Sequence, residues 1–361
     1  MQSANLGIEP EQKASGMAPS PKAEAGNTQP SPRRAAGTHQ MARAAWYSGP
    51  GKAELRTQRL APPLPGEARV RMQWSGISRG TERLVLKGAV PEGERARMRA
   101  PLQEGEFPFP VKYGYCAAGL VEEGPKELIG KPVFCLHPHQ DVFNAPIGML
   151  VPVPADVPLR RATLAANMET ALNAIWDAGA GPADRIVVVG GGIVGLMIAG
   201  LAARMPGAAV TLVDVAPERQ VLVESFGAAF ALPDVAPPDA DVVFHASVTA
   251  AGLATAIRCA GMEGTIVEMS WYGDQAIEAP LGGAFHSRRL RLISSQVGQV
   301  SAGHRPRWTY RRRLEAAMAL LGDAKLDALV AEEIAFADAA TALPRVLADG
   351  AAGLAPVIRY E

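Results

Sequence analysis

The chain has 361 residues, of which 48% are hydrophobic and 20% are charged, so it is long enough for two domains and a sizeable core. Its 36 Lys and Arg balance its 36 Asp and Glu, and this zero net charge gives no sign of nucleic acid or an anionic membrane as a partner. The three cysteines, Cys116, Cys135 and Cys259, form no C-x-x-C pair. That pattern fits a reducing cytoplasm and offers no structural zinc knuckle, so we expect a cytoplasmic protein.

Residues 1–40 differ in composition from the rest of the chain. They are rich in Ala, Pro, Ser, Gly and Gln and have almost no large apolar residues, so they cannot bury enough surface to offset their ordering entropy. They contain no continuous apolar core for a secretory signal, and Glu9, Glu11 and Glu24 argue against a transit peptide. We expect a disordered tail, or a mis-called start with Met41 as the true first residue.

The remaining chain divides into two patterns. Residues 43 to about 155 form short strand-like runs, such as 68–74 and 131–136, separated by prolines that break helices. A helix is expected at 156–178, and from 185 strands and helices alternate, which implies a parallel, doubly wound sheet. Its expected strands are 186–190, 209–213, 241–245, 264–269 and 290–295, and its expected helices are 193–205, 217–226 and 250–261. The final elements are expected at 310–322 (helix), 332–336 (strand), 338–349 (helix) and 355–360 (strand).

A glycine turn follows the apolar run 186–189. Gly190, Gly192 and Gly195 stand in G-x-G-x-x-G spacing. In this arrangement the first glycine permits a tight turn, the second lets the backbone approach a pyrophosphate, and the third lets the helix pack against the strand. The pattern predicts a dinucleotide-binding turn.

The residues after the turn strengthen this prediction. Ile193 and Val194 begin the expected helix, whose first amides can bind a phosphate. Asp214 ends the next apolar run, where a carboxylate can accept both hydroxyls of an adenosine ribose. A membrane span over 186–203, which holds no charge, is a competing interpretation, but its glycines and the strand that follows favour a buried strand and helix. A methyl-donor fold shares the turn, but the β-rich region upstream argues against it.

Four motifs together resemble the medium-chain dehydrogenase/reductase superfamily, over nearly everything from Met41 to Glu361. They are SGISRGTERLVLKG, VKYGYCAAGLVEEG, GKPVFCLHPHQ and the VVVGGGIVG turn. The resemblance implies a GroES-like domain at 41–160, completed by about 325–361, a Rossmann domain at 161–324, and a homodimer. The first motif is similar to that of the bacteriochlorophyllide a dehydrogenase branch and of proteins labelled zinc-binding alcohol dehydrogenase.

The same resemblance implies that the catalytic zinc is lost. The family takes its zinc ligands from the Cys of G-I-C, the His of G-H-E and a Cys or acid near the linking helix. Here the first position holds Ser78, or Arg79 if GTE is aligned with the family's GTD. The second holds Tyr115, and the third falls near Ala166. Cys116 stands at the Glu of G-H-E. One remaining thiol cannot supply the three ligands that a catalytic zinc needs, so we expect no metal.

NAD is the expected cofactor, and NADP is the less favoured one, because Asp214 repels a 2′-phosphate. Arg219 matches a basic position that covers the ribose in NAD-using relatives, although it could also tolerate a phosphate. Thr170 lies where relatives place a Thr beside the nicotinamide. Further contacts to the nicotinamide carboxamide are expected at strand ends, from the backbone of Met269, Ser270, Ser295 and Gln296. Ordinary strand-end polarity is the alternative.

Tyr115, His137 and Thr81 are the residues that we expect to replace zinc. Tyr115 stands at the zinc histidine's position, Thr81 at the place of a proton-relay hydroxyl, and His137 at a substrate-pocket wall, where an imidazole that titrates near neutrality could move a proton. Two alternatives stay open: His137 is a surface or capping residue, and a buried Arg79–Glu82 ion pair fills the vacated metal site.

The expected activity is a zinc-independent, NAD-dependent oxidoreductase acting on a small molecule. Its substrate would be a secondary alcohol/ketone pair or an activated double bond in a bulky molecule, flat if Trp271 and Tyr272 wall the pocket, and anionic if the arginines of 285–298 and 303–313 bind it. A solvated basic helix face is the alternative role of those arginines. The alternative functions are a tetrapyrrole hydroxyethyl dehydrogenase of the bacteriochlorophyllide type and a non-catalytic, nucleotide-binding sensor or structural protein.

Overall fold

The computed structural model describes residues 40–361. The expected tail therefore lies outside the described residues, apart from Gln40. The first strand, β1, begins at Gln40, directly before Met41.

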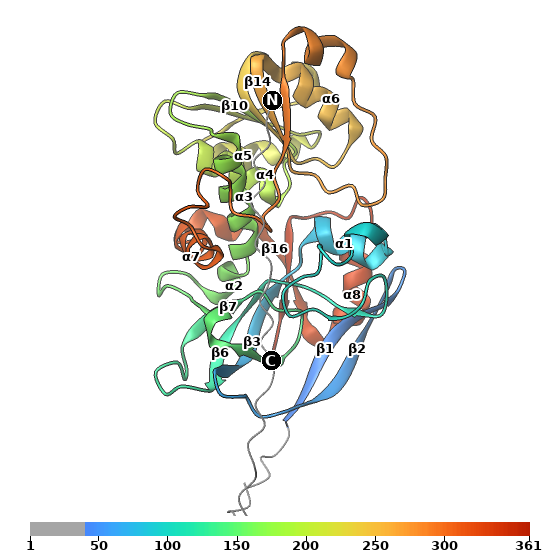
Figure 1. The fold of residues 1–361 in the computed structure, drawn as a ribbon, viewed down its shortest axis with the longest axis vertical. Helices are drawn as coiled ribbons and strands as arrows, with labels where there is room; N and C mark the ends of the chain where they lie inside the picture. The colour runs from blue at the N-terminus through green and yellow to red at the C-terminus, as the bar shows by residue number, and fades with distance from the viewer. Residues whose placement is uncertain (1–39) are drawn as a thin grey trace, which may run out of the picture. The chain divides into compact units, whose positions relative to one another are not determined.

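A parallel sheet of six strands occupies one part of the chain (Figure 1). Its order is β12-β11-β10-β13-β14-β15. β10, the first of these strands in the sequence, is central, and the direction of the strand order reverses between β10 and β13, as in a Rossmann sheet. The strands are β10 (Arg185–Val189), β11 (Ala209–Val213), β12 (Ala229–Ala231), β13 (Ala240–His245), β14 (Ala260–Glu268) and β15 (Arg291–Ser294). The predicted doubly wound sheet is confirmed, with β12 as an additional strand.

Helices connect and cover these strands. They are α3 (Ala165–Ala178), α4 (Ile193–Ala202), α5 (Gln220–Ser225), α6 (Ala250–Cys259) and α7 (Tyr310–Leu320). The expected helix at 156–178 is two helices, because a short α2 (Leu159–Ala162) precedes α3. The uncharged stretch 186–203 contains β10, the glycine turn and α4, so the competing membrane-span interpretation is wrong. Within residues 40–361 no helix is long and apolar enough to cross a bilayer.

Two further sheets form the β-rich part. One has four strands in the order β2-β1-β5-β4, and the other has seven, in the order β16-β17-β3-β6-β7-β9 with β8 paired to β3. The strands are β1 (Gln40–Gly49), β2 (Lys52–Leu60), β3 (Glu67–Gly76), β4 (Glu104–Gly105), β5 (Val111–Lys112), β6 (Ala117–Glu123), β7 (Pro132–Cys135), β8 (Val142–Pro146), β9 (Val151–Pro152), β16 (Val330–Ala335) and β17 (Ala355–Arg359). The predicted fold class, a Rossmann sheet with a β-rich GroES-like part, is confirmed.

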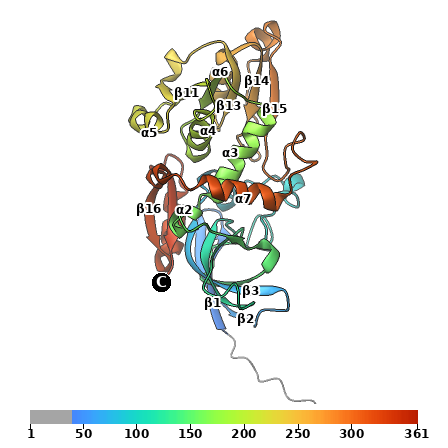
Figure 2. The same cartoon turned by 90° about the vertical axis from the view of Figure 1, so that its left-hand side faces the viewer.

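Segments far apart in sequence meet in the β-rich part. β17 pairs antiparallel with β3, so that Ile358 lies opposite Ser75, and α8 (Ala339–Val346) packs near β2. Figure 1 shows the red C-terminal segment beside blue β1 and β2 and beside α1 (Arg79–Lys87). Figure 2 shows α7 crossing next to α3.

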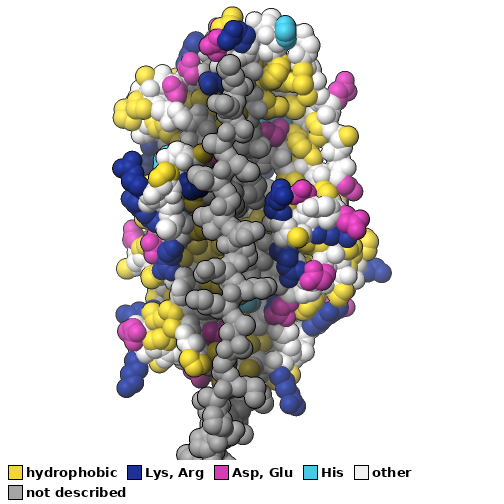
Figure 3. Space-filling model, in the orientation of Figure 1, with side chains coloured by type: hydrophobic (Ala, Val, Ile, Leu, Met, Phe, Trp, Pro, Cys, Tyr) yellow, Lys and Arg dark blue, Asp and Glu magenta, His cyan; other side chains and the backbone are white. Residues whose placement is uncertain are grey.

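One apolar core continues from the β-rich part into the Rossmann part. It includes Phe134 of β7, Leu164 and Met168 at α3, and Leu196 of α4, all buried. Apolar contact along α2 and α3 therefore joins the seven-stranded sheet to the six-stranded sheet. Basic and acidic side chains are interspersed over the face shown in Figure 3.

Candidate functional site

The glycine turn after β10 has the geometry that a dinucleotide requires. Gly190 has a positive φ of 113°, and a Cβ there would lie 2.8 Å from the carbonyl carbon of Ala246. A Cβ on Gly195 would lie 1.9 Å from the carbonyl oxygen of Gly190, so only glycine lets α4 pack this close to the turn. At Gly192, by contrast, a Cβ would meet nothing within 4 Å, which leaves the space that a pyrophosphate needs. The turn fits a dinucleotide.

α4 begins directly at this turn. Gly192 is its N-cap, and Ile193 and Val194 are its first residues. Both are partly buried, whereas Gly192 is exposed. The first-turn amides of a helix have no carbonyl partner within it and carry partial positive charge, so they can bind phosphate.

Asp214 is fixed against the turn at the end of β11. Its Oδ2 accepts a hydrogen bond from the backbone N–H of Gly191, and its Oδ1 accepts one from Ala216 at 2.9 Å. Each carboxylate oxygen keeps a second lone pair for a ribose hydroxyl. Arg219 lies five residues further on and donates to the carbonyl of Gly353 at 3.4 Å, so it links this edge of the sheet to the loop before β17.

Three predicted hydroxyl residues are already engaged within the protein. Thr170 donates to a carbonyl of its own helix, α3. Ser270 Oγ accepts a hydrogen bond from the N–H of Val248 at 3.1 Å, and Ser295 Oγ donates to Asp177 Oδ2 at 2.7 Å. Ser270 follows β14 and Ser295 follows β15, as the strand-end prediction requires.

Tyr115, Ser78 and Thr81, which the resemblance places where its members bind zinc, lie near one another. Burial and then the neighbouring Cys116 raise the pKa of Tyr115 well above its usual value, although hydrogen bonds with Ser78 and Thr81 oppose this. Burial, followed by the charge of Glu82, also raises the pKa of the Cys116 thiol. Both groups are therefore neutral, and the Tyr115 hydroxyl is a donor as well as an acceptor.

These groups do not fit a zinc ion. Ser78 and Tyr115 offer neutral hydroxyls where a catalytic zinc takes thiolate and imidazole, and the third position is the apolar Ala166. Within the described part of the chain no three His, Cys, Asp or Glu side chains are grouped as a metal site would require.

The alternative in which Arg79 pairs with Glu82 is wrong. Arg79 turns to the loop before β17 and donates to the carbonyls of Ala352 at 2.8 Å and Gly353 at 2.7 Å. Glu82 is instead fully buried and accepts hydrogen bonds from the Tyr47 hydroxyl at 2.6 Å and from the backbone N–H of Ser78 at 2.7 Å.

Glu82 also begins a buried polar chain that the sequence analysis missed. His139 Nε2 lies 3.0 Å from Glu82 Oε2, and its Nδ1 lies 2.7 Å from Ser75 Oγ. Ser75 Oγ lies 2.9 Å from the Tyr360 hydroxyl. The H-P-H sequence is the available signal, but it does not distinguish His139 from His137, the predicted residue.

His137, the selected histidine, does not titrate near neutrality. It is 4% exposed, stacks on Phe143 with ring centroids 3.7 Å apart, and has its Nδ1 2.8 Å from the carbonyl of Pro138. Burial, followed by the charge of Lys112, lowers the pKa of His137 to about 3. This low pKa argues against a change of charge at pH 7, and the catalytic role of His137 stays a prediction. The alternative of a surface residue is wrong, because His137 is buried.

The arginines downstream largely bind the protein itself. Arg313 is 2% exposed and pairs with Glu169, with 3.0 Å between Nε and Oε1. Arg288 donates to the carbonyl of Ala260 at 2.8 Å, and Arg311 donates to that of Leu150 at 2.8 Å.

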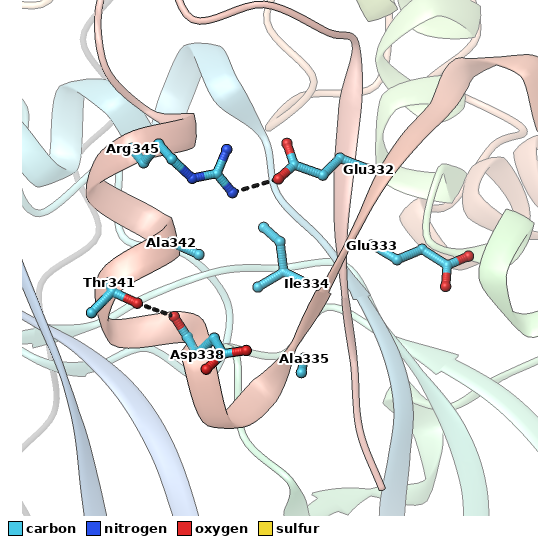
Figure 4. A pocket seen from close by; sticks show the side chains of 8 residues that line it. All are labelled: Glu332, Glu333, Ile334, Ala335, Asp338, Thr341, Ala342 and Arg345. Atoms are coloured by element: carbon cyan, nitrogen blue, oxygen red, sulfur yellow. Dashed lines mark hydrogen bonds and ion pairs between the residues drawn. The ribbon is translucent and has the colours of Figure 1, made fainter.

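A surface pocket of about 410 Å³ lies between β16 and α8 (Figure 4). Arg345 pairs there with Glu332. The lining residues are Glu332, Glu333, Ile334, Ala335, Asp338, Thr341, Ala342 and Arg345. None of them is a predicted site residue, so the candidate site remains at the glycine turn and around Tyr115.

Comparisons with known proteins agree with this fold. The family "Alanine dehydrogenase/PNT, C-terminal domain" matches residues 166–266, from α3 to β14. Among solved structures, L-idonate 5-dehydrogenase from Escherichia coli K-12 is similar with a TM-score of 0.72 and 15% identity, over 89% of this chain and 99% of that one. A protein described as a zinc-binding dehydrogenase from Sinorhizobium meliloti 1021, bound to NADP, has a TM-score of 0.70 and 18% identity, over 89% and 99%. An alcohol dehydrogenase from E. coli CFT073, complexed with NADH, has a TM-score of 0.70 and 15% identity, over 88% and 99%.

Proposed function

We propose that this chain is a zinc-independent, NAD-dependent oxidoreductase of the medium-chain dehydrogenase/reductase superfamily. Asp214, fixed by Gly191 and Ala216 beside the glycine turn, is the observation that carries the proposal. A carboxylate at this place suits free ribose hydroxyls and repels a 2′-phosphate. The solved structures with bound NADP or NADH support a nicotinamide cofactor in general.

The bound dinucleotide would supply or accept the hydride of a secondary alcohol/ketone pair or an activated double bond. In the direction of reduction, negative charge develops on the substrate oxygen, and a positioned donor must stabilise it. We assign this role to the Tyr115 hydroxyl, whose polar neighbours are Ser78 and Thr81. Because a Tyr115 phenolate is unfavourable, a proton given to the substrate would be replaced from solvent, passed on by the neighbouring Ser78 and Thr81 hydroxyls.

His137 would then form part of the wall rather than an acid or base. A neutral imidazole stacked on Phe143, with its Nδ1–H donated to a backbone carbonyl, is a poor proton donor at pH 7.

The test is turnover of NADH with a panel of ketones, quinones and tetrapyrroles. Tyr115→Phe should lower kcat by about 10²–10⁴, the usual worth of such proton transfer, and leave NADH affinity unchanged. Tyr113→Phe is the matched control, because Tyr113 is a buried neighbour packed edge-on against Tyr115. Equal kcat values for the two variants would remove Tyr115 from the mechanism.

The same panel separates the alternative functions. Turnover confined to tetrapyrroles would favour the bacteriochlorophyllide-type dehydrogenase. Tight NADH binding without turnover of any compound would favour a nucleotide-binding sensor or structural protein, as the replaced zinc ligands would allow.

We also propose a homodimer. β15 is an edge strand, since among residues 40–361 it pairs only with β14, and its Leu292 is 39% exposed. An exposed strand edge is a template for pairing with a second chain. Light scattering should give twice the chain mass for the wild type and the chain mass for Leu292→Arg.

A further inference from the structure

Three side chains at the carboxyl ends of β13 and β14 form a chain of hydrogen bonds. Ser247 Oγ lies 2.8 Å from His245 Nε2, and His245 Nδ1 lies 2.8 Å from Glu268 Oε2. β13 and β14 are parallel neighbours in which His245 pairs with Glu268. This is the spacing of a nucleophile, a base and a carboxylate that orients the base.

The surroundings fix the direction of these hydrogen bonds. Burial raises the pKa of Glu268, but hydrogen bonding and charge from His245 and hydrogen bonds from Ser270 outweigh it, so that the pKa lies below its ordinary value. The ionised carboxylate accepts Nδ1–H of His245, and it also accepts the Tyr272 hydroxyl at 3.2 Å. His245 Nε2 is then left to accept the proton of Ser247.

The exposure of the three residues differs as the chemistry requires. His245 is fully buried and the Glu268 side chain is 16% exposed, whereas Ser247 is partly exposed and Val248 and Thr249 beside it are exposed. His245 is therefore held inside the protein, and the turn that carries Ser247 lies at the surface.

The backbone around Ser247 is a strand-turn-helix. Ser247 lies in the turn between β13 and α6, and Val248 has a φ of 57°, a strained value for a β-branched residue. A Cβ on Gly252 of α6 would lie 1.9 Å from Ser247 Oγ and 2.8 Å from His245 Nε2. Glycine at 252 therefore lets the helix approach the pair. The Gly252 amide donates to Thr249 Oγ1 at 3.0 Å, so the first-turn donors left without a partner in the helix are the amides of Ala250 and Ala251.

We propose that Ser247 is an activated nucleophile that takes the acyl group of small activated carboxylic esters. Ser247 Oγ forms a bond to the carbonyl carbon as its proton moves to His245 Nε2, and the amides at the start of α6 are placed to bind the oxyanion. The ester C–O bond then breaks, and the leaving alcohol takes the proton from Nε2. Water next attacks the acyl-serine with His245 as base, releasing the acid and restoring the Ser247 hydroxyl.

The test uses the full chain, without cofactor, and a fluorophosphonate probe that forms a covalent bond only with an activated serine. Peptide mass mapping should find one adduct, on Ser247. Ser247→Ala should abolish it, and Ser225→Ala should leave it, since Ser225 is an exposed serine whose hydroxyl donates to the carbonyl of Leu222. p-Nitrophenyl acetate should show a burst of nitrophenol that Ser247→Ala removes.

Two further variants test the chain of hydrogen bonds. Glu268→Gln should slow labelling by about 10²–10⁴, as loss of an oriented base does. Gly252→Ala keeps all three side chains but pushes Ser247 away from His245, and it should also slow labelling. Circular dichroism establishes that each variant is folded. If Glu268→Gln is not folded, Tyr272→Phe replaces it, because it removes a hydrogen bond to the same carboxylate. An unlabelled wild type, an adduct only at other serines, or equal rates in the folded variants would each overturn the proposal.

Discussion

Asp214 accepts a hydrogen bond from the glycine turn through one oxygen and from the N–H of Ala216 through the other, so its carboxylate cannot rotate away from the ribose position. Asp214→Ala should weaken NADH binding by about 1–3 kcal/mol, the usual worth of hydrogen bonds to a charged group. Because the change also lifts the repulsion of a 2′-phosphate, NADPH binding should improve. Fluorescence titration with both cofactors measures the two effects.

Glu218→Ala is the charge-matched control, because Glu218 is exposed and precedes Arg219. It should alter neither affinity. An unchanged cofactor preference in Asp214→Ala would assign the selectivity to Arg219 or to the turn.

The residues of the candidate site were only partly predictable. Tyr115 and Thr81 could be placed together because both stand in motifs of fixed spacing, and the Thr81 hydroxyl lies near enough to affect the pKa of Tyr115. His137 and His139 are separated by a single proline, and nothing in the sequence shows which ring faces Glu82. That arrangement depends on Gly114, where a Cβ would lie 2.9 Å from His139 Cδ2.

At the level of elements, the packing of α4 on β10 depends on Gly195. Gly195→Ala places a methyl group 1.9 Å from the Gly190 carbonyl oxygen, so the helix must move away from the turn. We expect a melting temperature lower by several degrees, since a few kcal/mol shift a chain of this size by that much, and loss of NADH binding. Gly80→Ala, also a helical glycine but with nothing within 4 Å of the added Cβ, should leave the melting temperature unchanged or raise it.

The contact between the ends of β13 and β14 should make the stability of the fold decrease at low pH. Burial raises the pKa of Glu268, but the stronger opposing effect of His245 and Ser270 leaves it below its ordinary value. A depressed carboxyl pKa contributes stability above the unfolded pKa, and this is lost as the pH falls through the folded value. Glu268→Gln should therefore flatten the acid side of a plot of melting temperature against pH.

Glu278→Gln, at an exposed position, should keep the wild-type slope. Parallel curves for Glu268→Gln and the wild type would show that the carboxylate is not held as described.

Strands could be predicted where apolar runs are long, and contacts between strand ends could not. Five strands of the six-stranded sheet were predicted from such runs, but β12 has only three residues, Ala229–Ala231, and was missed. His245 and Glu268 each end an apolar run, yet only the order of the strands makes them neighbours. The sequence shows where these strands end but not which strands are neighbours, so the contact between His245 and Glu268 could not be predicted.

On the scale of the whole molecule, the composition of residues 1–40 predicts that they are dispensable. A chain that starts at Met41 should keep the melting temperature of the full chain, because the segment has too few apolar residues to add to a core. Differential scanning calorimetry of the two chains compares them directly. A decrease of several degrees would show that the segment stabilises the fold.

The pairing of β17 with β3 determines when each sheet can be finished during synthesis. The six-stranded sheet takes all its strands from 185–294, a continuous stretch, whereas β3 receives β17 from 355–359. On the ribosome, the second part of the chain to emerge can therefore close its sheet first. In the first part, β8 can already pair with Glu67–Arg71 of β3. The end of β3 at Trp74–Gly76 has to wait for β17 until nearly the whole chain has been translated, exposed to other nascent chains and to chaperones.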